Sequence, residues 1–163
     1  MDLVAQPALL FLPLVLPVCI YVAWSDLARM TIPNVAVAAL LLIYAVGGLI
    51  ALPVEVYLWR WSHFAVVLVL GFFANMARLF GAGDAKFMAA AAPFVMWQDL
   101  SHMLSLLCIC LLAGVATHRL ARRAGLPRLT PDWKSWTSGK RFPMGYPLAA
   151  TLVIYLGLSA ISR

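Results

Sequence analysis

The sequence predicts an all-α polytopic membrane protein with about six transmembrane helices. Hydrophobic residues make up 64% of the chain and charged residues only 11%, whereas a water-soluble domain carries about 25% charged residues. The mean hydropathy is +0.95, so polar side chains are too few to cover a water-soluble particle. At this length we expect a single membrane-embedded domain spanning residues 1–163.

Six apolar segments mark the expected spans. They are Ala8–Trp24, Val35–Leu52, Ser62–Ala77, Ala85–Trp97, Leu100–Thr117 and Tyr146–Ile161. A helix needs about 20 residues to cross the hydrocarbon core, with a range of about 17–25. The fourth segment is shorter and rich in alanine, which suits a short helix packed closely inside a bundle. The sequence does not decide whether this helix begins at Ala85 or at the glycines that precede it.

The basic residues predict the orientation of the chain. With the N-terminus outside, ten of the twelve basic residues fall on the cytoplasmic side: Arg29, Arg78, Lys86, Arg119, Arg122, Arg123, Arg128, Lys134, Lys140 and Arg141. Only Arg60 and Arg163 stay outside, a bias that follows the positive-inside rule. The net charge of +6 therefore reflects topology, and nucleic acid is not an expected partner. The cytoplasmic basic loop 118–145 either rests on anionic lipid headgroups or serves only to orient the chain.

Neither the cysteines nor the histidines form a metal-binding or redox pattern. The cysteines are Cys19, Cys108 and Cys110, and the histidines are His63, His102 and His118. The cysteines lie in apolar runs without a CxxC pair, and the histidines fall near opposite membrane faces in the expected topology. We predict no metal site and no cofactor.

Two of the six acidic residues fall at the cytoplasmic edge of predicted spans. Asp26 follows the first apolar segment, and Asp84 opens the fourth. An acidic residue at membrane depth costs roughly 2.5–3.5 kcal/mol, so it is usually paired or functional. Either aspartate alone is also compatible with a helix-capping role. The prediction that both aspartates lie on the same side of the membrane favours the hypothesis that they act together in a chemical reaction.

Two adjacent carboxyl groups can hydrolyse a peptide bond with water alone. When they lie close together they cannot both ionise easily, so they share a proton and their pKa values separate. The ionised member takes a proton from the attacking water, and the protonated member donates to the oxyanion and then to the leaving amine. The pair titrates as a unit, so neither role is assigned to one residue. Gly81 and Gly83 leave space beside Asp84 for a substrate backbone or a neighbouring helix.

Three motifs in order resemble those of the type IV prepilin peptidase family. They are Asp26 followed by Ile32-Pro33-Asn34, Gly81-Ala82-Gly83-Asp84-Ala85-Lys86, and Pro143-Met144-Gly145-Tyr146-Pro147. The first looks like the family's first-aspartate motif. The second is similar to the GxGD signature of membrane aspartic peptidases and to the GD-x-K motif of prepilin peptidases. The third resembles the P-x-G-x-P element. A lone GxGD is a weak signal, but three ordered motifs at cytoplasmic span boundaries are specific.

The resemblance implies a GxGD aspartic peptidase bundle in the bacterial inner membrane, with Asp26 and Asp84 as catalytic residues. It also implies prepilin substrates, in which a short basic leader precedes an apolar helix, and cleavage at the cytoplasmic face. The chain lacks the paired CxxC motifs of the longer family members. It therefore resembles the short form associated with Flp-type tight-adherence pili, and N-methyltransferase activity is not expected. The sequence gives no indication of oligomeric state.

Five further motif residues have expected supporting roles. Lys86 either stabilises the ionised pair, meets the substrate, or reaches the lipid headgroups. Asn34 is a candidate to hold Asp26 by a hydrogen bond, and Pro33 sets the entry of the second span. We expect Pro143 and Gly145 to shape the junction between the loop and the last helix, with contact to the substrate as the alternative.

Two other functions compete with this hypothesis. A small membrane transporter or a pilus-assembly scaffold would use the aspartates as a proton or cation relay. A lipoprotein signal peptidase would carry an N-x-x-D-R-type motif, which this chain lacks, and a pair of aspartates at the outer face.

Overall fold

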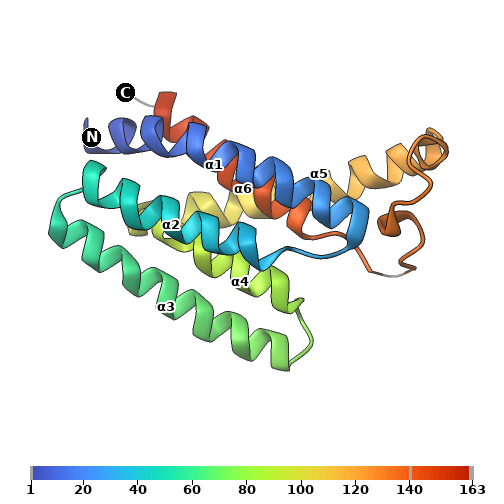
Figure 1. Ribbon diagram of the computed structural model, residues 1–163, viewed down its shortest axis with the longest axis horizontal. Coiled ribbons are helices and arrows are strands. Elements are labelled where there is room, and N and C mark those ends of the chain that lie inside the picture. The colour runs from blue at the N-terminus through green and yellow to red at the C-terminus, as the bar shows by residue number, and fades with distance from the viewer. Residues whose placement is uncertain (1, 140, 162–163) are drawn as a thin grey trace.

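The computed structural model describes residues 2–139 and 141–161, and the regular structure of this part of the chain is entirely helical (Figure 1). The α-helices are α1 (Asp2–Arg29), α2 (Asn34–Ala51), α3 (Val54–Met76), α4 (Ala82–Ala91), α5 (Leu100–Arg123) and α6 (Gly145–Ile161). Two 3-10 turns lie between α4 and α5, η1 (Ala92–Phe94) and η2 (Trp97–Asp99), and two lie between α5 and α6, η3 (Leu126–Arg128) and η4 (Lys134–Trp136). The predicted all-α fold is confirmed.

Four of these helices are long and apolar enough to cross a membrane. The qualifying segments are Pro7–Arg29, Asn34–Ala51, Val54–Met76 and Trp97–Arg123. The apolar helix α6 is slightly shorter, at 17 residues. The ten residues of α4 give a length of about 15 Å, half of the roughly 30 Å hydrocarbon core. The fourth apolar segment therefore forms a short helix that starts among the glycines, at Ala82, and ends in a 3-10 turn.

Several helices extend beyond the apolar segments that indicated them. α1 continues through Asp26 to Arg29, α3 begins well before Ser62, and α5 runs on to Arg123. Apolar runs stop at the first charged residues, whereas main-chain hydrogen bonding continues and long basic side chains reach the interface from the helix ends. As a result Asp26 lies in the last turn of α1, and the basic loop shortens to residues 124–144 with η3 and η4 inside it.

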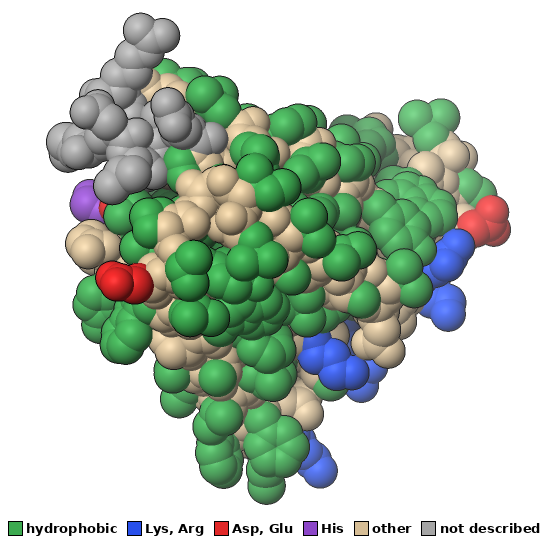
Figure 2. Space-filling view, turned by 60° about the vertical axis from the view of Figure 1, so that its left-hand side comes forward, with side chains coloured by type: hydrophobic (Ala, Val, Ile, Leu, Met, Phe, Trp, Pro, Cys, Tyr) green, Lys and Arg blue, Asp and Glu red, His purple; other side chains and the backbone are tan. Residues whose placement is uncertain are grey.

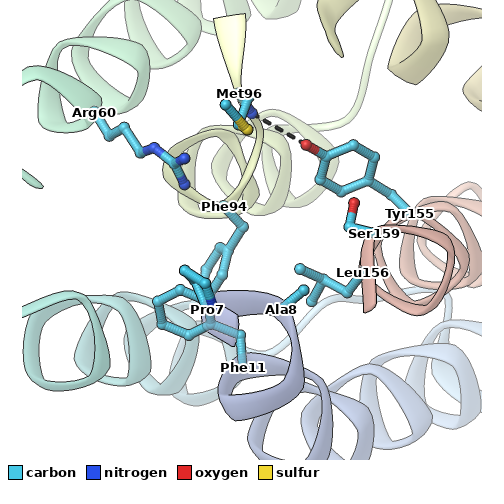
Figure 3. Close-up of a pocket in the computed structure, with 9 residues that line it drawn as sticks. All are labelled: Pro7, Ala8, Phe11, Arg60, Phe94, Met96, Tyr155, Leu156 and Ser159. Atoms are coloured by element: carbon cyan, nitrogen blue, oxygen red, sulfur yellow. Dashed lines mark hydrogen bonds between the residues drawn. The ribbon is translucent and has the colours of Figure 1, made fainter. Parts of the chain in front are cut away.

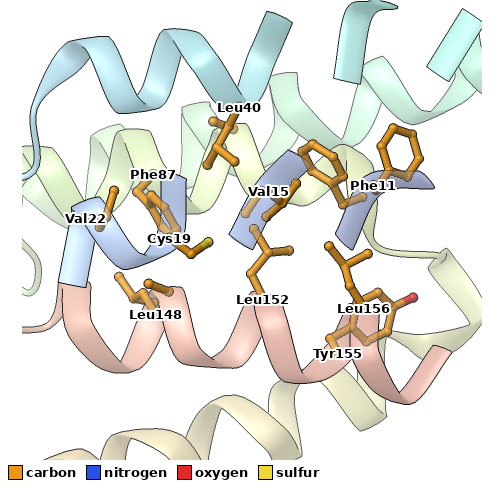
Figure 4. Packing of buried hydrophobic residues seen from close by; sticks show 14 of the residues in the cluster. Phe11, Val15, Cys19, Val22, Leu40, Phe87, Leu148, Leu152, Tyr155 and Leu156 are labelled. Carbon is orange, nitrogen blue, oxygen red and sulfur yellow. The ribbon is translucent and has the colours of Figure 1, made fainter. Parts of the chain in front are cut away.

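The core of the bundle forms where α1 packs along α6 (Figure 4). Helix α1 contributes Phe11, Val15, Cys19 and Val22 at helical spacing, and α6 contributes Leu148, Leu152, Tyr155 and Leu156. Leu40 of α2 and Phe87 of α4 close this layer from the other side. In a membrane these contacts gain little from exclusion of water, so close packing supplies most of their stabilisation.

Helix α4 packs mainly on α3, through small residues. A Cβ atom placed on Gly71 of α3 would lie 3.0 Å from the Cβ of Ala85 of α4. Small residues at a crossing let two helices approach closely. The start of α4 lies at the same end of the bundle as the end of α1 and the starts of α2 and α6, the right-hand end in Figure 1.

The face of the bundle shown in Figure 2 is predominantly apolar, as a lipid-exposed surface requires. Large hydrophobic side chains are exposed along α3, among them Leu58, Val66, Leu70 and Phe73. The Lys and Arg side chains visible in Figure 2 gather toward one end of the molecule.

Candidate active site

The Asp26 carboxylate is buried at the junction of α1 and α6. Its side chain is 5% exposed. Its Oδ2 atom accepts hydrogen bonds from the backbone N–H groups of Gly145 at 2.6 Å and of Tyr146 at 3.3 Å. These N–H groups belong to the first turn of α6, where donors have no partner within the helix and attract negative charge. The third sequence motif therefore supplies hydrogen-bond donors to the aspartate of the first.

A tight turn after α1 returns the chain to this junction. Met30 adopts a left-handed conformation with φ of 57°, and the Ser25 hydroxyl donates to the Thr31 carbonyl at 3.0 Å. A left-handed residue commonly ends a helix, although glycine usually occupies that position. The turn places Ile32 against the starts of α4 and α6.

Ile32 separates two glycines that come from different motifs. A Cβ atom on Gly83 would lie 3.3 Å from the Cβ of Ile32. A Cβ atom on Gly145 would lie 2.9 Å from the Cδ1 of Ile32 and 3.0 Å from the Oδ2 of Asp26. Both positions accommodate glycine because a side chain would push against Ile32, and at Gly145 also against the carboxylate.

Asp84 is held in the first turn of α4. Its Oδ2 accepts the backbone N–H of Gly81 at 3.2 Å, the reciprocal half of a helix-capping arrangement. A Cβ atom on Gly81 would lie only 2.7 Å from the same oxygen. Burial raises the pKa of the half-buried Asp84 carboxyl, and the hydrogen bond from Gly81 opposes that rise.

The two aspartates, distant in sequence, lie near enough for their charges to interact. Asp26 is buried and Asp84 half-buried, so the medium between them screens charge less than bulk water does. Two carboxyl groups whose charges interact do not ionise independently of each other. This arrangement is compatible with general acid–base chemistry on a bound peptide.

Lys86 and Asn34 join the second motif to the first. The Lys86 Nζ donates to the Asn34 Oδ1 at 3.3 Å, and both side chains are exposed. Asn34 was expected to hold Asp26 by a hydrogen bond; in the structure its amide oxygen accepts from Lys86, and the backbone N–H groups that bond to Asp26 belong to α6. Pro33 stands at the N-cap position of α2 with φ of −66°, and its predicted role in setting the entry of this helix stays a prediction.

The third motif forms the start of α6. Pro143 and Gly145 are buried, and the Tyr146 hydroxyl lies 3.2 Å from the Thr117 hydroxyl of α5. Pro143 and Gly145 both lie at the loop-to-helix junction, and the Gly145 N–H of this junction bonds to Asp26. Sequence reasoning did not single out Ile32 and Tyr146, although both lie inside recognised motifs.

Among the described residues, no group of three or more His, Cys, Asp or Glu side chains is placed to hold a metal ion.

Comparisons with known proteins agree with the motifs. The family model described as type IV leader peptidase family matches residues 13–118, which include Asp26 and Asp84 and end before Gly145. No curated protein and no solved structure matches the chain. Because the match covers more than half of the sequence, the chain belongs to the type IV leader peptidase family.

Proposed function

We propose that the chain is an aspartic endopeptidase that cleaves the leader peptide of type IV pilin precursors of the Flp type, with Asp26 and Asp84 as the catalytic pair. The observation that carries the proposal is that all three motifs meet around Ile32. Gly83 and Gly145 both adjoin this side chain, and Asp26 bonds to Gly145. The two carboxyl groups lie within electrostatic reach of each other.

The proposed reaction needs one water molecule and one shared proton. The ionised carboxylate accepts a proton from water as the water oxygen bonds to the scissile carbonyl carbon, and the protonated carboxyl donates to the developing oxyanion. The C–N bond then breaks as one carboxyl group donates its proton to the leaving amine and the other carboxylate accepts a proton from a hydroxyl group of the tetrahedral intermediate. Water is consumed, and the pair ends in its initial protonation state.

The proposed location is the bacterial inner membrane, with the N-terminus outside and the aspartates at the cytoplasmic face. The support is the basic bias, since Arg29, Arg78 and Lys86 all lie at the end of the bundle that holds the pair. The α5 end and the 124–144 loop add further basic residues. Two of the twelve basic residues on which the orientation was predicted, Lys140 and Arg163, lie outside the residues that the structure describes. The basic bias predicts a cytoplasmic aspartate end.

The proposed partners are prepilins, whose apolar helix would share the bilayer with the peptidase. N-methylation of the new pilin terminus is not included, because this sequence has no CxxC pair.

The direct test is cleavage of a Flp-type prepilin by the purified chain in detergent or in inverted membrane vesicles. We expect a shortened pilin with a single new N-terminus after the leader, no added methyl group, and release of the leader into the medium outside the inverted vesicles. EDTA and iodoacetamide should leave the rate unchanged, since the proposed pair needs neither metal nor thiol. Loss of cleavage with EDTA and its recovery with added zinc would contradict the mechanism. An unprocessed prepilin would contradict the function.

The pH dependence should follow from the Asp84 environment. Burial raises the pKa of this carboxyl, so it keeps its proton at pH values where an exposed aspartate, with a pKa of about 3.9, has lost it. The rate should therefore fall on the alkaline side at a pH above the pKa of an exposed aspartate, measured as kcat against pH.

The substitution Gly81→Ala tests whether the alkaline limb of this pH profile reports the Asp84 carboxyl group. The new methyl group displaces the Asp84 Oδ2 from the Gly81 N–H, a bond that lowers the pKa. Its loss should move the alkaline limb to higher pH. A limb that stays in place, or moves lower, would contradict the role of Asp84 in the titrating pair.

A further inference from the structure

A buried arginine lies at the end of the bundle opposite the aspartates. Arg60, in the second turn of α3, is only 8% exposed, whereas the adjacent Trp59 is 68% exposed. Its guanidinium points into the bundle in Figure 3, toward a small cavity whose far wall is formed by Tyr155 and Ser159 of α6. The sequence places Arg60 at a membrane edge, where an arginine usually reaches water or lipid headgroups. Here it faces the protein interior.

The partners of Arg60 come from the segment that follows α4. Its Nη1 donates to the Pro93 carbonyl in η1 at 3.5 Å. The charged or titratable groups that face it are Asp99, Tyr155 and Tyr44, each of which interacts with it electrostatically. Asp99 is the acidic member of this set, and its charge offsets part of the cost of burying the guanidinium without a direct ion pair among the contacts of the described residues.

Tyr155 of α6 forms hydrogen bonds to the segment that contains Asp99 and Met96. The Tyr155 hydroxyl donates to the Asp99 Oδ2 at 2.8 Å and accepts the Met96 N–H at 3.2 Å. Figure 3 shows the Met96 bond crossing from the chain after η1 to α6. The cavity between Arg60 and Tyr155 measures about 20 Å³, enough for one water molecule. The segment Pro93–Asp99 is thus held from α3 on one side and from α6 on the other.

This anchorage bears directly on α4, and through it on Asp84. The near end of α4 contacts α3 at Gly71 and Ala85, and its far end is the segment bound by Arg60. Pro93 lies nine positions after Asp84, a distance of about 14 Å in helical geometry. A tilt of about 4° around Pro93 would therefore displace Asp84 by about 1 Å, and a shift of that size can cost about 100-fold in rate.

We propose that Arg60 is a positioning residue of the peptidase: with Asp99 and Tyr155 it fixes the far end of the α4 segment and thereby the setting of Asp84 beside Asp26. The inference rests on the proposed function for its catalytic consequence. Its structural consequence, a fixed position of α4, is independent of any substrate.

The kinetic test compares Arg60→Gln, Arg60→Lys, Asp99→Asn and the double variant Arg60→Gln/Asp99→Asn. Controls are Arg119→Gln, an exposed arginine of α5, and Glu55→Gln, an exposed acid at the same end as Arg60. We expect Arg60→Gln to lower kcat by at least about tenfold with KM changed less than about twofold, and Arg60→Lys to recover part of the loss. Asp99→Asn should lower kcat too, and the double variant should be no worse than the worse single one. The controls should behave as wild type.

A structural readout makes the test independent of activity. Spin labels at Val35 and Ala82, exposed positions at the starts of α2 and α4, report the distance between these helices once the native cysteines are replaced. The distribution should be narrow in the wild-type background, broader or shifted with Arg60→Gln, and unchanged with Arg119→Gln.

These results separate the possible failures. An unchanged label distance in Arg60→Gln, or losses of kcat that multiply in the double variant, would overturn the positioning role. A folded wild-type chain that cleaves no prepilin would overturn the proposed function, while the label distances would still decide whether Arg60 positions α4.

Discussion

Replacing either Asp26 or Asp84 with asparagine should reduce prepilin cleavage by about 10²–10⁴-fold or more, the range lost when a positioned general acid or base is removed. The double variant should be scarcely worse than either single variant, because one carboxyl without its partner cannot share a proton. The measurement is kcat/KM on a prepilin for the two single variants and the double one.

Asparagine is the appropriate substitution because it preserves the shape of the site. In Asp26→Asn the side-chain amide oxygen can still accept the Gly145 and Tyr146 N–H groups that bond to the native carboxylate. In Asp84→Asn the amide oxygen can likewise accept the Gly81 N–H. Both variants should therefore insert and unfold like the wild type. Asp132→Asn in the exposed loop is the matched control and should keep full activity. Wild-type cleavage by either single variant would refute the catalytic pair.

The helices and the motif residues could be predicted from the sequence because both leave local signals. Apolar runs mark the helices, and Asp26 and Asp84 are recognisable because each is an acidic residue at the end of an apolar run. The helix ends could not be predicted in the same way. α3 begins at Val54 and contains Glu55 and Arg60, charged residues that end an apolar window but do not end a helix.

The burial of Arg60 could not be predicted, for a reason specific to membranes. In a soluble helix the polar face marks the solvent side, so periodicity reveals which residues are buried. Lipid is as apolar as the protein core, so the inward and outward faces of α3 carry similar residues. Leu70 is exposed although it is as apolar as the buried Leu40. Hydrophobicity therefore shows that α3 is a membrane helix, but not which face packs on α4.

The contacts of the site were also beyond local reasoning. The Asp26 carboxylate is bound by residues of α6 that are distant in sequence, and Asn34 is bound by Lys86 of α4. Motif order indicated that these segments belong together. It did not indicate which side chain pairs with which, because that depends on the turn at Met30 and on the close packing of Ile32.

The second large effect is expected at Gly145. Gly145→Ala should lower kcat by about 10–100-fold, because a displacement of the reacting groups by a fraction of an ångström to about 1 Å has an effect of that order. The added methyl group would meet the Ile32 Cδ1 at 2.9 Å and the Asp26 Oδ2 at 3.0 Å. One of these groups must move, and movement of the carboxylate lengthens its 2.6 Å bond to the Gly145 N–H. Gly145→Val, with a bulkier side chain, should remove activity almost completely.

Gly157→Ala in the same helix is the matched control, because a Cβ atom there has no neighbour within 4 Å. It should keep wild-type kcat and slightly stabilise the helix, since alanine is favoured over glycine in a helix by about 1 kcal/mol. Comparing the kcat of Gly145→Ala with that of Gly157→Ala separates the effect of the clash at the site from any general effect of alanine in α6.

A rescue experiment identifies which contact matters. Ile32→Val removes the Cδ1 atom that lies closest to the new methyl group, so Ile32→Val combined with Gly145→Ala should recover much of the lost kcat. If instead the double variant is as slow as Gly145→Ala alone, the contacts that remain at 3.0 Å, with the Ile32 Cγ1 and the Asp26 Oδ2, account for the loss. If Gly145→Ala cleaves as fast as Gly157→Ala, then α6 can move away from α1 without disturbing the pair, and the contact between Gly145 and Asp26 is not needed for catalysis.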